Sequence, residues 1–169
     1  MALVTTPGAS NANSYISIAD ASGYFSLSYN RTAWADVSTR DKEKSLAEAT
    51  RLLDLFVQWK GYIASTTQRL RWPRTGVIDV DGRTVDSESI PQAIKDATCE
   101  LAYSILSNEG FDISENPVDK VKVGSISVDF DIGQKSVGFP KIVRDMVAFW
   151  GVLQIPSSSG VQTAKLVRT

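Results

Sequence analysis

The clearest pattern of hydrophobic and polar positions lies in residues 39–59, where apolar side chains recur at the spacing of a helix. Charged residues supply much of the opposite face, as expected of a helix that packs on a core and meets solvent on its other side. The pattern therefore predicts an amphipathic helix over about residues 39–59. Its apolar row consists of Leu46, Ala49, Leu53 and Phe56.

A shorter helix is predicted ahead of it, over about residues 18–28. The hydroxyl of Ser17 can accept a hydrogen bond from a backbone N–H of the first turn, and Asp20 lies close to the positive helix end. Both features are typical of a helix N-terminus, so the start of this helix is better defined than its end.

A third helix is predicted from Ser89 to Gly110. Ser89 and Gln92 have the spacing of a capping box, and glycine is a common helix stop. Two apolar stripes make the helix apolar over more of its circumference than a simple surface helix. It is therefore expected either at the centre of the core or shared with a neighbouring molecule. The stripes are Ile94, Ala97, Thr98, Leu101, Ala102 and Ile105, and Cys99, Tyr103 and Leu106.

The fourth predicted helix covers the stretch PKIVRDMVAFWGVL, which carries two adjacent apolar rows and three charged residues. Periodicity alone leaves two interpretations of the third and fourth helices. They are core helices of a monomer, or they provide the two different faces that a subunit of a cyclic head-to-tail assembly needs for its neighbours.

A tight hairpin turn is predicted at Asp81-Gly82, between β-forming residues, because this pair accepts the positive φ angles of such a turn. A cation site built on Asp79, Asp81 and Asp86 is the alternative. The spacing lacks the glycine and the terminal glutamate of a calcium loop, and this favours the hairpin.

Residues 121–123 and 126–130 alternate in opposite phases around Gly124-Ser125, which predicts a second hairpin. The predicted fold is therefore mainly α: a small bundle of about four helices with one or two β-hairpins and an extended C-terminal tail. The domain is expected to span residues 1–156. The Ser/Gly-rich residues 157–169 form the tail.

Composition narrows the function classes. The chain has 169 residues, 43% of them hydrophobic, which indicates one soluble domain, and no apolar run is long enough for a membrane span. Histidine is absent and Cys99 is the single cysteine, so the usual general base, the Ser-His and Cys-His nucleophiles and intrachain disulfides are excluded. We expect no catalytic site, no metal and no cofactor.

The stretch QRLRWPRTG, which contains Trp72 and Pro73, raises a more specific question. Pro73 disfavours a helical conformation at Trp72, so the stretch is expected to be a loop or an edge segment. Either Arg69, Arg71 and Arg74 face DNA phosphates while Trp72 stacks on a base, or Trp72 anchors the segment to the helices and the arginines pair with nearby carboxylates.

Overall charge favours the structural interpretation of this stretch. The chain carries 18 Lys and Arg against 19 Asp and Glu, with a sequence pI near 5.5. Nucleic-acid binders usually show a basic balance, so tight DNA binding is not expected.

The order of these features resembles the head-tail connector, or adaptor, proteins of tailed bacteriophages, many of which carry the label of DnaT-like single-stranded-DNA-binding proteins. The resemblance covers roughly residues 13–154. It rests on the order and spacing of NSYISIADASGYF, EATRLLDLFVQWKG, QRLRWPRTG, DVDG, IPQAIKDATCELA and KVGSISVDF.

The resemblance implies a structural virion protein, assembled in the bacterial cytoplasm as a ring that commonly has twelve copies. Such a ring would dock on the portal protein, extend the DNA channel and present a surface to a tail or stopper protein. Double-stranded DNA would pass through without tight binding. Single-stranded-DNA binding is the alternative function, and an enzymatic function is the least favoured.

The tail carries a small apolar and basic group, Leu166, Val167 and Arg168, after a flexible tether. It buries too little surface to offset an ordering cost of roughly 1–2 kcal/mol per residue, so it cannot fold alone. We expect either a tail that is disordered in every state or one that orders on docking between portal subunits.

Deletion of residues 157–169 should leave the melting temperature unchanged and abolish co-sedimentation with portal rings, because the tail adds docking contacts rather than core. Portal binding that survives the deletion undiminished would place docking on the folded body.

Overall fold

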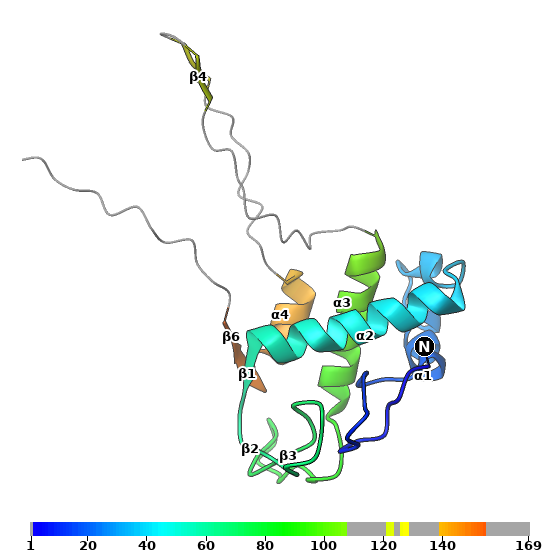
Figure 1. Ribbon diagram of the computed structural model, residues 1–169, viewed down its shortest axis with the longest axis vertical. Coiled ribbons are helices and arrows are strands. Elements are labelled where there is room, and N and C mark those ends of the chain that lie inside the picture. The colour runs from blue at the N-terminus through cyan, green and yellow to red at the C-terminus, as the bar shows by residue number, and fades with distance from the viewer. Residues whose placement is uncertain (1, 108–120, 124–125, 129–138, 155–169) are drawn as a thin grey trace, which may run out of the picture.

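The computed structural model describes residues 2–107, 121–123, 126–128 and 139–154. Figure 1 shows a small helical bundle with short strand pairs at its edges, and this confirms the mainly α class predicted from the sequence. The helical elements are α1 (Ile18–Ser26), the single 3₁₀ turn η1 (Thr32–Trp34), α2 (Thr39–Phe56), α3 (Gln92–Ser107) and α4 (Lys141–Val147).

Helix α3 is the centre of the bundle. It packs against α1, α2 and α4, and α2 lies across it in Figure 1. Most of its buried residues come from the first predicted stripe and Cys99 comes from the second, which places the helix in the core of this chain. The buried set is Ile94, Ala97, Thr98, Cys99, Glu100, Leu101, Ala102 and Ser104.

The buried carboxylate of Glu100 is fully engaged. It accepts hydrogen bonds from the Tyr24 hydroxyl at 2.9 Å and from two nitrogens of Arg31 at 3.0 and 3.2 Å. Arg31 also lies over the ring of Tyr103, 4.7 Å from its centroid. A buried charge needs such partners, and here they fix the segment after α1 against α3.

Two of the helix ends differ from the sequence prediction. Residues 57–59 form strand β1 (Val57–Trp59) instead of the last turn of α2, and residues 151–153 form strand β6 (Gly151–Leu153) instead of the end of α4. The two strands pair antiparallel, with Trp59 opposite Gly151. A Cβ atom at Gly151 would lie 2.8 Å from the carbonyl oxygen of Gln58, so only glycine permits this approach.

The start of α3 also differs from the prediction. The Ser89 hydroxyl donates to the carbonyl oxygen of Asp86, and the Gln92 amide donates to the Asp96 carboxylate at 2.8 Å. The capping box is therefore not formed. The backbone N–H groups of Ile94 and Lys95, in the first turn of α3, donate to the carbonyl oxygen of Pro91.

Both predicted hairpins are present. Ile78 and Thr84 form an antiparallel bridge around the Asp81-Gly82 turn, where Gly82 has a φ of 80°. Strands β4 (Val121–Val123) and β5 (Ile126–Val128) pair antiparallel, and the Gly124-Ser125 turn predicted between them lies outside the described residues. A further pair, β2 (Tyr62–Ile63) and β3 (Arg74–Thr75), closes the loop that contains Trp72.

Trp72 lies entirely inside the core, with 0% of its surface exposed. Its ring meets Trp59 and Trp150 edge to face, at centroid distances of 6.0 and 6.1 Å. Pro73, joined to it by a cis peptide bond, is also buried. The tryptophan therefore joins the loop to the β1–β6 end of the bundle.

Replacement of Trp72 by alanine should lower the free energy of unfolding by about 3–5 kcal/mol, because it leaves a large cavity. Trp72→Phe should cost less, since the indole N–H has no hydrogen-bond partner among the described residues and none is lost. Chemical denaturation followed by circular dichroism measures both effects.

Trp34→Phe serves as the matched control, because the Trp34 indole donates to the Ser22 hydroxyl at 3.2 Å and this bond would be lost. A Trp72→Ala protein as stable as the unaltered chain would show that the loop is not anchored by this ring.

Candidate functional site

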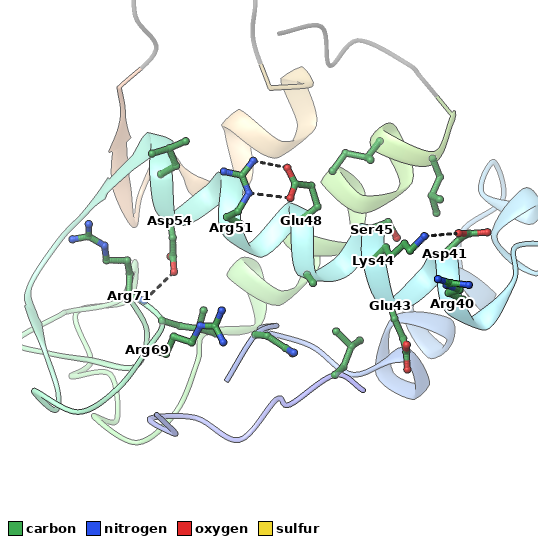
Figure 2. Close-up of a pocket in the computed structure, with 17 residues that line it drawn as sticks. Arg40, Asp41, Glu43, Lys44, Ser45, Glu48, Arg51, Asp54, Arg69 and Arg71 are labelled. Atoms are coloured by element: carbon green, nitrogen blue, oxygen red, sulfur yellow. Dashed lines mark hydrogen bonds and ion pairs between the residues drawn. The ribbon is translucent and has the colours of Figure 1, made fainter. Parts of the chain in front are cut away.

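A groove of about 980 Å³ runs along the outer side of α2 and is the candidate functional site. Its walls come from α2, the N-terminal segment, the loop before Trp72 and the last turn of α3. Figure 2 shows the charged side chains that line it, with α2 crossing the middle of the view. Residues far apart in the sequence therefore form one surface.

The loop beside the groove is held by side chains that bond to its own backbone. The buried amide of Gln68 donates to the carbonyl oxygens of Leu70 and Pro73 at 2.8 and 3.0 Å. Arg74 donates to the carbonyl oxygens of Lys60 and Gly61, each at 2.6 Å. These bonds replace a regular sheet and give the loop a defined shape.

Asp54 ties this loop to α2. One carboxylate oxygen accepts a hydrogen bond from the Arg71 backbone N–H at 3.0 Å, as Figure 2 shows. The other accepts from the Trp59 indole at 3.3 Å and from the Tyr15 hydroxyl. The N-terminal segment, β1 and the loop thus converge on a single carboxylate.

Burial sets the titration of this cluster. Desolvation raises the pKa of the Asp54 carboxyl, although its three donors act in the opposite direction. Burial, together with the neighbouring Asp54, raises the pKa of the Tyr15 phenol well above its usual range. Tyr15 therefore remains a neutral hydrogen-bond donor across the physiological pH range.

Five basic side chains line the groove, and they differ in how far they are neutralised. Arg51 forms a two-point ion pair with Glu48, and Lys44 lies 4.0 Å from Asp41. The guanidinium groups of Arg40, Arg69 and Arg71 form no hydrogen bond or ion pair within the described ranges of the chain. These three remain available to an anionic partner.

The arginines of the QRLRWPRTG stretch therefore divide into two kinds. Arg69 and Arg71 are exposed on the groove, whereas the Arg74 guanidinium is engaged by backbone oxygens. Within the described part of the structure, none of the three forms an ion pair with a carboxylate, so the expected pairing is not found there. Base stacking by Trp72 is wrong, because its ring has no exposed surface.

Sequence reasoning missed the contribution of α2 to this surface. Arg40, Lys44 and Arg51 stand four and seven residues apart, a spacing that places them on one side of a helix. This spacing of basic residues is visible in the sequence, but it is typical of any helix face exposed to solvent. Only the fold places the basic residues of α2 on the same groove as Arg69 and Arg71.

The remaining predicted sites are placed as follows. Asp79 accepts hydrogen bonds from the backbone N–H groups of Asp81 and Arg83 and pairs with the Arg83 side chain at 3.1 Å, so it shapes the hairpin turn. Within the described residues, no group of three or more metal-ligand side chains occurs, and no helix is long and apolar enough to cross a membrane. The predicted portal-binding residues Leu166, Val167 and Arg168 lie outside the described residues.

Large apolar side chains are exposed at several places, among them the segment after α1 and strand β2. Leu27 and Tyr29, which follow α1, are 91% and 95% exposed. Tyr62 and Ile63 of β2 are 77% and 45% exposed. In Figure 1 the two elements lie at different ends of the molecule.

Comparison with known proteins identifies the family. A family model described as "Putative DnaT-like ssDNA binding protein" matches residues 1–169. The chain belongs to this family. Neither the curated proteins nor the solved structures gave a match.

Proposed function

We propose that the protein binds single-stranded DNA along the groove beside α2. The observation that carries this proposal is a group of three guanidinium groups that line the same groove and form no hydrogen bond or ion pair within the described residues, those of Arg40, Arg69 and Arg71. Arginine side chains are well suited to phosphate oxygens, because their planar fork donates two parallel hydrogen bonds. The family description points to the same ligand.

The groove also offers apolar surface between the charges. Leu55 of α2 is 61% exposed, and the partly buried Leu70 lines the groove from the loop before Trp72. Unstacked bases expose apolar faces that can pack on such side chains, whereas a duplex keeps these faces covered. A preference for single strands therefore follows from the lining.

The binding is expected to be weak and strongly dependent on salt. The groove carries four carboxylates beside its five basic groups, and no aromatic side chain lines it within the described residues. Aromatic stacking normally supplies about 1–3 kcal/mol per base to single-strand binders. Without it, the affinity depends on phosphate contacts, which release counterions and weaken as salt rises.

The double variant Arg69→Gln and Arg71→Gln should weaken binding to a fluorescent oligothymidine at least tenfold at low salt. Each lost phosphate contact should reduce the slope of log K against log salt by about 0.7, so the loss for two contacts is about 1.4. Fluorescence anisotropy at several salt concentrations measures both quantities.

Arg83→Gln is the matched control, because Arg83 is exposed and paired with Asp79 and Asp81 on the hairpin, away from the groove lining. It should leave the affinity unchanged. Equal loss in the control, or a double variant that binds normally, would refute binding along the groove, and equal affinity for duplex would refute the preference for single strands.

A second candidate function is that of a head-tail adaptor subunit in a phage virion, which forms a ring, docks on the portal and meets a tail or stopper protein. The exposed apolar side chains at two ends favour it. A head-to-tail ring contact joins two different surfaces of neighbouring copies, and Leu27 with Tyr29 on one side and Tyr62 with Ile63 on the other provide such a pair. The resemblance in segment order supports the same function.

If the second candidate is correct, native mass spectrometry should detect a closed ring of about twelve copies, and the Leu27→Ser, Tyr29→Ser variant should shift it to monomer. The reason is the loss of apolar area from one side of every contact. Leu55→Ser removes an exposed leucine from the groove instead and should leave the mass unchanged. A monomer at all concentrations for the unaltered chain would contradict self-assembly through these surfaces.

A further inference from the structure

We infer that Asp54 is a positioning residue for DNA binding: its carboxylate holds the loop so that Arg69 and Arg71 face the groove. This inference rests on the proposed single-strand binding. Asp54 itself need not contact DNA. It acts through the Arg71 backbone N–H, which donates a hydrogen bond of 3.0 Å to the Asp54 carboxylate.

The argument starts from the number of segments that meet at Asp54. Its donors are Tyr15 of the N-terminal segment, Trp59 of β1 and the Arg71 backbone. Hydrogen bonds to an ionised carboxylate are stronger than those between neutral groups. The carboxylate therefore fixes the spacing between α2 and the loop at the point where Arg69 and Arg71 reach the groove.

The charged and titratable groups around Asp54 do not hold the loop to α2 in its place. Arg71 and Arg74 are the cations that act on it, and Tyr15 is the facing titratable group. Arg74 bonds to Lys60 and Gly61 carbonyl oxygens rather than to the carboxylate. Within the described chain, Asp54 is thus the side chain of α2 that bonds to the backbone of Arg71.

The sign of the electrostatic effect separates positioning from simple charge. A carboxylate on the groove opposes the binding of an anion, so removing its charge alone should strengthen DNA binding. Asparagine has nearly the same shape but accepts through one oxygen only, so it cannot satisfy all three donors in the same way. If Asp54 positions the loop, Asp54→Asn should therefore weaken DNA binding, whereas the loss of charge alone would strengthen it.

The test is a titration of the full-length protein with the same fluorescent oligothymidine. Asp54→Asn should weaken binding about three- to tenfold, as expected for the loss of hydrogen bonds to a charged group. Glu48→Gln is the matched control, because it also removes one negative charge from α2 and releases Arg51. It should bind as tightly as the unaltered chain or more tightly.

Hydrogen exchange at the Arg71 amide provides a second measurement, which should become faster in Asp54→Asn while the amides of α3 stay protected. Should Asp54→Asn not fold, Tyr15→Phe replaces it, since this variant removes one donor and no charge; a two- to threefold loss of affinity is expected. Tyr15→Phe that binds normally would overturn the inference in that case.

The outcomes also separate this inference from the proposed function. If the Arg69, Arg71 double variant loses binding while Asp54→Asn binds as well as or better than the unaltered chain, positioning by Asp54 is wrong and single-strand binding stands. If the double variant binds normally, the proposed function is wrong and the inference falls with it.

Discussion

The burial of Trp72 is the interaction on which the rest of this structure depends. Its ring packs against Trp59 and Trp150, and so joins β1, the loop and the turn between α4 and β6 in one aromatic cluster. Burying a side chain of this size contributes several times the stabilisation of an exposed ion pair. The tryptophan points inward. Arg71, which precedes it, and Arg69, on the other side of Leu70, are exposed at the surface.

Polar contacts then convert this anchored loop into a defined surface. Gln68 and Arg74 satisfy backbone oxygens that no regular sheet reaches, and Asp54 connects the loop to α2. Partial burial of a carboxylate is costly unless donors surround it, and at Asp54 the donors come from three separate segments. The loop that contains Trp72 therefore has two roles. Its tryptophan packs into the core, and the guanidinium groups of Arg69 and Arg71 lie on the groove.

The two candidate functions use different parts of the molecule. Single-strand binding uses the groove along α2, whereas ring assembly uses the exposed apolar groups after α1 and on β2. The balanced charge of the chain and the buried Trp72 limit how tightly DNA can bind, and the free arginines are what favour such binding at all. Family membership fits the DNA-binding function, and the exposed apolar ends fit an assembling subunit.

The sequence by itself determined the local elements. The Ser17 cap and Asp20 predicted α1, the 3.6-residue periodicity predicted the body of α2 and α3, and the Asp81-Gly82 pair predicted its turn, because these features depend on neighbours along the chain. The tertiary structure alone decided the rest. Strands β1 and β6 replace two predicted helix ends because their hydrogen-bond partners lie almost a hundred residues apart in sequence. Likewise, the fold decided that Trp72 faces the core, that Arg74 bonds to backbone oxygens and that Arg40 and Arg69 line the same groove, since long-range packing sets which groups share a surface.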